Sequence, residues 1–147
     1  MTEKGQILIV DDDEDILVAA KLLLRRNGFD VTTSHQPEEI PALLNQHTFQ
    51  VIMLDMNFGP GESSGQQGLK WLEKIKSLLP DCVIVMITAH GGMNLAIEAM
   101  KRGATDFVIK PWQNEKLVAT ISSAANLGTV RTEAKHLQTT NQLLIEV

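Results

Sequence analysis

Five residues with side chains suited to metal and phosphoryl chemistry stand at the ends of short apolar runs: Asp11, Asp12, Asp55, Thr88 and Lys110. Clustered carboxylates resist ionisation beside one another unless a cation is present. Mg²⁺ prefers oxygen ligands and typically takes one or two carboxylates together with a phosphate. Phosphoryl transfer needs mainly positioning and neutralisation of charge, so acids, a lysine and a hydroxyl at one place predict this chemistry.

The runs that carry these residues are short, rich in valine and isoleucine, and mostly continuous. They are Ile7–Val10, Val31–Thr33, Val51–Leu54, Val83–Ile87 and Phe107–Ile109. Such runs are typical of strands covered on both faces of a parallel sheet.

The segments between the runs have helical spacing, and their apolar stripes predict faces that pack on the core. The stripes are Ile16, Ala20 and Leu23; Ile40, Leu43 and Leu44; Leu69, Leu72, Ile75 and Leu79; Met93, Ile97 and Met100; and Leu117, Ile121 and Ala124. Asn27-Gly28 and Pro80 are expected to end the first and third helices.

Alternating strands and helices predict an α/β fold with a doubly wound parallel sheet. Ligand sites in such sheets lie at the carboxyl ends of the strands, where the strand order reverses. Asp11, Asp12 and Asp55 are therefore expected to meet at one edge of the sheet.

Simpler roles are open to each of these residues on its own. Asp13, Glu14 and Asp15 are expected to cap the following helix and to favour its positive end. Lys110 alone could be a surface lysine and Thr88 a hydroxyl bonded to backbone, so the prediction depends on their occurring together.

Four segments resemble the receiver domains of response regulators in two-component signalling systems, over roughly residues 5–126. They read ILIVDDDEDIL, VIMLDMN, VIVMITAH and GATDFVIKPW. The resemblance implies a flavodoxin-like (βα)5 domain with five parallel strands in the order 2-1-3-4-5. The stretch from Thr88 to Trp112 is similar to receivers of regulators that activate transcription through a AAA+ ATPase domain, the sigma-54 activators.

The resemblance also implies roles for individual residues. Asp55 would accept a phosphoryl group from a sensor histidine kinase. Asp12 and Asp55 would bind Mg²⁺ directly, Asp11 would bind it through water, and the Asn57 backbone carbonyl would complete the protein ligands. Lys110 would pair with the carboxylate and then with a phosphoryl oxygen.

A switch is the second implication of the resemblance. Thr88 would swing towards the phosphoryl group and Phe107 would turn inward with it. The readout face, and one route to a homodimer, would be built by the fourth helix, the fifth strand and the fifth helix. Lys110-Pro111 resembles the family's cis peptide, and Asn57 and His90 stand where the family tunes the lifetime of the acyl phosphate. The chain would be a signalling switch, not a turnover enzyme, and no organic cofactor is implied.

The sequence departs from the family in two places. The loop from Met56 to Gly68 is several residues longer and holds four glycines, so we expect a mobile segment that either covers the site or is a tolerated insertion. Residues 127–147 carry a 3-4 apolar spacing, predicting a helical linker that begins a coiled coil. That spacing runs through Leu127, Val130, Ala134, Leu137, Asn141 and Leu144.

Composition limits the other classes of function. A net charge of −5 with scattered basic residues argues against a domain that contacts nucleic acid directly. No stretch approaches the roughly 20 apolar residues that span a bilayer, and no signal-peptide core is present, so a cytoplasmic protein is expected. Cys82 is expected to be a buried, unreactive thiol.

Three rival functions are weighed against the switch. Asp11-x-Asp13 superficially resembles the nucleophile motif of haloacid-dehalogenase-type phosphatases, but Glu14-Asp15 replaces the usual Gly-Thr and Asp55 would have no role. A flavodoxin-like anion-binding module would need a phosphate loop where this chain has five acids. A receiver-like interaction scaffold without phosphorylation is disfavoured because all the signature residues are present.

Overall fold

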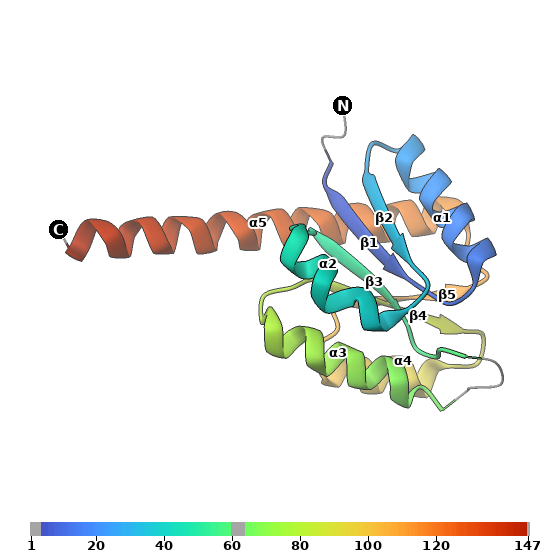
Figure 1. The fold of residues 1–147 in the computed structure, drawn as a ribbon. Helices are drawn as coiled ribbons and strands as arrows, with labels where there is room; N and C mark the ends of the chain where they lie inside the picture. The colour runs from blue at the N-terminus through green and yellow to red at the C-terminus, as the bar shows by residue number, and fades with distance from the viewer. Residues whose placement is uncertain (1–3, 60–63, 147) are drawn as a thin grey trace.

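A computed structural model describes residues 4–59 and 64–146, without the side chains of residues 135, 136 and 138–146. The elements in chain order are β1 (Gln6–Val10), α1 (Glu14–Arg26), β2 (Asp30–Ser34), a 3-10 turn (Pro37–Glu39), α2 (Ile40–Gln46), β3 (Val51–Asp55), α3 (Gln66–Leu78), β4 (Ile84–Ala89), α4 (Met93–Lys101), β5 (Asp106–Lys110) and α5 (Asn114–Glu146). The five strands form one parallel sheet in the order β2-β1-β3-β4-β5, which confirms the predicted fold (Figure 1).

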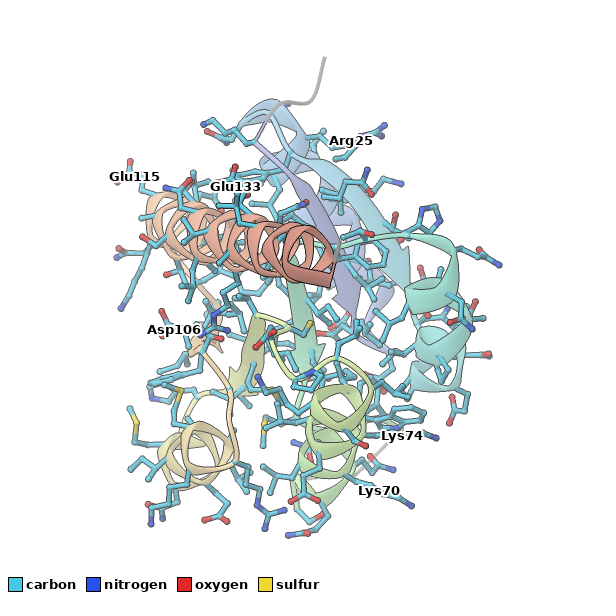
Figure 2. The ribbon with its side chains drawn as sticks, turned by 90° about the vertical axis from the view of Figure 1, so that its left-hand side faces the viewer. Arg25, Lys70, Lys74, Asp106, Glu115 and Glu133 are labelled. Carbon is cyan, nitrogen blue, oxygen red and sulfur yellow. The ribbon has the colours of Figure 1, made fainter. Side chains whose placement is uncertain are left out.

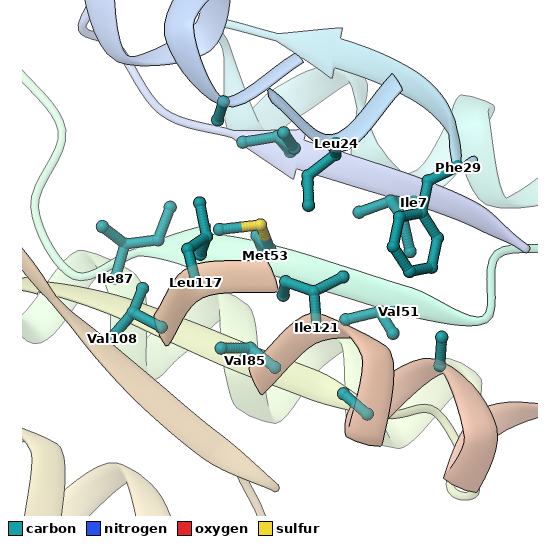
Figure 3. Packing of buried hydrophobic residues seen from close by; sticks show 14 of the residues in the cluster. Ile7, Leu24, Phe29, Val51, Met53, Val85, Ile87, Val108, Leu117 and Ile121 are labelled. Carbon is teal, nitrogen blue, oxygen red and sulfur yellow. The ribbon is translucent and has the colours of Figure 1, made fainter. Parts of the chain in front are cut away.

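The sheet is the middle of three layers. Alternate residues of β1, β3 and β4 point to opposite faces, and both faces are buried, as the continuous apolar runs predicted. On one face Ile7, Met53 and Val85 pack against α1 and α5 (Figure 3). The other face is covered by α2, α3 and α4. Charged side chains such as Lys70 on α3 and Glu115 on α5 lie on the outside of the two helical layers (Figure 2).

The helix boundaries follow local signals. The Asp13 side chain caps α1 by accepting hydrogen bonds from the backbone N–H groups of Asp15 and Ile16, as predicted. The helix ends at Arg26, before Asn27, and Gly28 takes a positive φ of 94° that favours glycine.

The predicted core face of α4 is wrong. Met93, Ile97 and Met100 keep 48%, 47% and 40% of their surface exposed, whereas Ala96 and Ala99 are fully buried. The sheet accepts only methyl-sized side chains at the closest line of contact with α4, so the larger residues lie on its outer side.

Smaller corrections apply to α1 and α3. The buried face of α1 centres on Leu17, Ala20 and Leu24, while Ile16 and Leu23 are half-buried at its edges. Leu79 follows the end of α3 and is 39% exposed, so it does not extend the buried stripe.

Helix α5 runs on well past the sheet (Figure 1). Gly128 does not interrupt it. This glycine is buried where the helix crosses Gln50, and a Cβ there would collide with the Gln50 carbonyl oxygen. Beyond it, Arg131 donates a hydrogen bond of 3.4 Å to the carbonyl of Asp81. Contacts with the base of the domain therefore continue to Arg131.

The predicted apolar stripe of the tail is exposed where the structure describes it. Val130 and Leu137 are exposed, as is Ala134, whereas Leu127 packs against the core. The side chains of Asn141 and Leu144 lie outside the described residues. None of the helices in the described part of the chain is long and apolar enough to cross a membrane.

Candidate functional site

The strand order brings the predicted site residues to one edge of the sheet. Asp55 is the last residue of β3 and pairs in register with Ile87 of β4, next to Thr88. Lys110 is the last residue of β5. Asp11 and Asp12 follow β1, the other neighbour of β3. The carboxyl ends of neighbouring parallel strands meet at one edge, which is why residues far apart in the sequence converge here.

Three acids form the centre of this site. Asp11 is fully buried, Asp55 is 6% exposed and Asp12 is exposed. One carboxylate oxygen from each lies within 4.8 Å of the other two, so the cluster could hold a metal ion. Hard oxygen ligands in this number suit a hard divalent cation.

Lys110 is the cation that the chain itself supplies to the acids. Its Nζ lies 2.8 Å from Asp11 Oδ2 and 3.7 Å from Asp55 Oδ1. Asp11 Oδ1 accepts a hydrogen bond of 3.0 Å from the Asp13 N–H. Asp11 Oδ2 has the ion pair but no hydrogen bond of good geometry, so a buried oxygen is left under-coordinated.

One lysine does not neutralise this much buried charge. Burial and, after it, the negative charge of Asp11 together raise the pKa of Asp55 to about 7, against the opposing effect of Lys110. Burial also raises the pKa of Asp11. Burial lowers the pKa of Lys110, but its carboxylate partners outweigh this and raise it overall. The site is therefore short of positive charge when the acids are ionised.

Thr88 lies beside the acids, with 2% of its surface exposed. Its Oγ1 touches Gly92, where a Cβ would collide with it. A cavity of about 290 Å³ opens beside this hydroxyl, lined in part by Asn57, His90 and Leu95. Thr88 and Asn57 therefore border the same cavity.

Phe107 lies farther along the same side of the domain. It is half-buried, packs against the core on the α4 side and lines a groove of about 510 Å³ with Trp112 and Lys116. The peptide bond between Lys110 and Pro111 is cis, as the family resemblance implied.

The long loop after β3 contributes contacts that the sequence did not reveal. The Gly59 N–H donates to Asp12 Oδ2 at 2.7 Å, and the Phe58 N–H donates to Gln67 Oε1 at 2.7 Å. Asn57 Oδ1 accepts a hydrogen bond of 2.6 Å from the Gly65 N–H. Met56 and Phe58 are buried in the core. Both ends of the loop are therefore held, while residues 60–63 lie outside the described residues and the predicted cover over the site stays a prediction.

Fold and site together define an α/β domain with a metal-competent acidic site at the carboxyl edge of its sheet. The family model of the response regulator receiver domain matches residues 7–122. The chain belongs to this family, the receiver domains of two-component signalling, and the predicted resemblance is confirmed.

Known relatives agree with this assignment. The transcriptional regulatory protein FixJ of Bradyrhizobium diazoefficiens is 34% identical over 124 residues, covering 84% of this chain and 58% of that protein. The receiver domain of a response regulator from Bacteroides fragilis is 41% identical, with a TM-score of 0.73 over 82% of this chain and 95% of that one. NtrX from Brucella abortus is 28% identical, with a TM-score of 0.80 over 90% of this chain and 30% of its own. The chain thus spans little more than half of FixJ.

Proposed function

We propose that this receiver accepts a phosphoryl group on Asp55 from a sensor histidine kinase. One observation carries the proposal: Asp55 is a nearly buried acid that lies 3.7 Å from Lys110, and one of its carboxylate oxygens lies within 4.8 Å of oxygens of Asp11 and Asp12. Burial, and after it the negative charge of Asp11, raises the pKa of Asp55. An acid site that is short of positive charge and lies beside a lysine suits a phosphoryl acceptor that works with a cation.

Mg²⁺ is the cation we assign to the acids. The donor set fits, because it offers carboxylate oxygens and leaves the buried Asp11 Oδ2 without a good hydrogen bond. Asp12 and Asp55 would ligate it directly, Asp11 would ligate it through water, and the Asn57 carbonyl would add a ligand. Mg²⁺ would supply neutralisation of the charge on the transferring oxygens.

The chain's own residues divide the chemistry. A carboxylate oxygen of Asp55 attacks phosphorus, the new P–O bond forms, and the P–N bond to the kinase histidine breaks. The leaving imidazole takes a proton from solvent. Lys110, already paired with Asp55 Oδ1, moves onto a phosphoryl oxygen, and the Thr88 hydroxyl donates to another. The product is an aspartyl phosphate, so the domain is a switch and not a turnover enzyme.

The surface of α4, β5 and α5 is the one that partners bind in response to phosphorylation. Movement of Thr88 towards the phosphoryl group frees space into which Phe107 turns, and the acyl phosphate shifts the population towards this arrangement. The exposed Met93, Ile97 and Met100 support a protein-binding role for this face, because three large apolar side chains spaced four and three residues apart on α4 lie in solvent. A second copy of the chain or an output domain would bind there.

Residues 1–126 would form the receiver and residues 127–147 a helical linker. Because the helix contacts the base of the domain as far as Arg131, its free part would begin just beyond that residue. The exposed Val130 and Leu137 support pairing of two linkers as a coiled coil. Sedimentation tests this: the full chain should dimerise and a version ending at Glu133 should dimerise less, whereas two identical monomers would refute linker pairing.

The output would be transcriptional, through an output domain such as the AAA+ ATPase of sigma-54 activators. The similarity to the transcriptional regulatory protein FixJ supports a transcriptional output. The receiver itself would not contact nucleic acid. Because sensor kinases draw their phosphoryl groups from ATP, we assign the reaction to the cytoplasm.

A haloacid-dehalogenase-like phosphatase is not favoured. Such an enzyme needs a free acid two residues after its nucleophile, but the Asp13 side chain is engaged in capping α1.

Labelling with a small phosphodonor tests the proposal. The wild-type chain should gain one phosphoryl group in the presence of Mg²⁺ and lose it to hydroxylamine, which cleaves acyl phosphates. Asp55→Asn should not be labelled, while Asp81→Asn, a change at an exposed acid after α3, should be labelled as the wild type is. Equal labelling of Asp55→Asn would refute the proposal.

A further inference from the structure

Two hydrogen bonds from neighbouring backbone amides link the start of α3 to the acid cluster. Gln67 is the second residue of α3 and lies on the surface, outside the predicted site. Its Oε1 accepts the hydrogen bond from the Phe58 N–H at 2.7 Å. The next amide, that of Gly59, donates to Asp12 Oδ2 at the same distance. Gln67 therefore holds the peptide next to the one that holds Asp12.

The geometry of the loop makes this link specific. The Phe58 side chain is buried in the core, which fixes one side of the segment. Gly59 has a φ of +95°, a left-handed conformation that turns the chain at the point where its N–H meets Asp12. The Gln67 side chain supplies the acceptor for the Phe58 amide. The buried Phe58 side chain, the turn at Gly59 and the Gln67 hydrogen bond therefore together position the Gly59 N–H.

Asp12 is the member of the acid cluster that most needs such help. Asp11 and Asp55 are held by burial and by Lys110, but Asp12 is exposed. Within the described residues, the Asp12 side chain accepts its hydrogen bond from the Gly59 N–H. Carboxylates that ligate metals are usually held by outer hydrogen bonds, and loss of such partners typically weakens metal binding by about 10–100-fold.

We propose that Gln67 is a positioning residue for the cation site, acting on Asp12 through the Phe58–Gly59 backbone. The proposal rests on the proposed function, because it deepens the Mg²⁺ site assigned there. The long loop after β3 would then be part of the site's construction and not merely a tolerated insertion.

Neighbouring glutamines provide a matched test in the full chain. Gln67→Met keeps the length of the side chain but removes the acceptor. Gln66→Met makes the same change one residue away, where the side chain makes no such contact with the described residues. Gln67→Glu keeps an acceptor, and Gln66→Glu controls for its added charge. Both positions are exposed, so all four variants should fold, and thermal unfolding checks this.

Mg²⁺ titration by calorimetry and amide hydrogen exchange are the readouts. We expect Gln67→Met to bind Mg²⁺ about tenfold more weakly than Gln66→Met and to exchange the Phe58 and Gly59 amides faster. Gln67→Glu should bind as Gln66→Glu does.

Two outcomes overturn the positioning role alone. Gln67→Met could bind Mg²⁺ as the Gln66→Met control does. It could also bind Mg²⁺ more tightly, which would mean that the Gly59 N–H competes with the cation for Asp12. Absence of Mg²⁺ binding in the wild-type chain would instead refute the proposed cation site and the positioning role together.

Discussion

Replacing Asp55 by asparagine should make the metal-free protein more stable at alkaline pH. Asp55 is nearly buried beside the charge of Asp11, and burial together with that charge raises its pKa to about 7 from the usual 3.8. The folded protein therefore holds the Asp55 proton more tightly than the unfolded chain does. The stabilisation of the folded state by the protonated Asp55 is complete below about pH 3.8 and is lost as the pH rises through about 7.

The size of the effect follows from the two pKa values. They differ by about 3, and each pH unit corresponds to roughly 1.4 kcal/mol, so ionised Asp55 lowers the free energy of unfolding by on the order of 4 kcal/mol. The asparagine side chain would carry no charge but would still need hydrogen-bond partners. We therefore expect Asp55→Asn to gain about 2–4 kcal/mol at about pH 8 and less than half of that at about pH 5.

Urea unfolding at the two pH values, with a chelator present, measures this gain. Asp81→Asn serves as the control, because Asp81 is exposed at the opposite end of the sheet. Added Mg²⁺ should then stabilise the wild-type protein more than Asp55→Asn, because a ligand that binds only the folded state stabilises it. A gain that is absent at about pH 8, or equal at both pH values, would refute the electrostatic reasoning.

Three further predictions test the scaffold by urea unfolding. Asp13→Ala removes the cap of α1 and should cost about 1 kcal/mol; no loss would show that the cap is dispensable. Gly128→Ala should cost about 1–3 kcal/mol because its methyl group meets the Gln50 carbonyl, and an unchanged stability would mean that α5 shifts freely. Ile97→Gln should change stability by less than about 0.5 kcal/mol, and a loss of about 2 kcal/mol would place Ile97 in the core after all.

Much of the fold could be predicted because its signals are local or periodic. The apolar runs were long enough to mark five strands, and Asp13 and Gly28 carried their own capping and turn chemistry. The face of α4 could not be predicted in the same way. Its large apolar residues suggested a buried stripe, yet the distance between helix and sheet favoured Ala96 and Ala99, and that distance is a property of the packed layers.

Some residues of the site could likewise be predicted from the sequence, and others could not. Residues at strand ends were predictable, because parallel strands of known order must bring Asp11, Asp55 and Lys110 together. The role of Gln67 was not, since its partner is a backbone amide in an irregular loop that leaves no periodic signal. Its one hint was an amide side chain at the start of a helix, near the end of an unusually long loop.

Peptide mapping of the phosphorylated chain tests the central claim most directly. The full chain is incubated with a small phosphodonor and Mg²⁺, digested, and analysed by mass spectrometry to locate the phosphoryl group. The proposed site predicts one label, on Asp55, that depends on Mg²⁺. A label on Asp11 or His90 in the wild-type chain, with Asp55 unmodified, would contradict it.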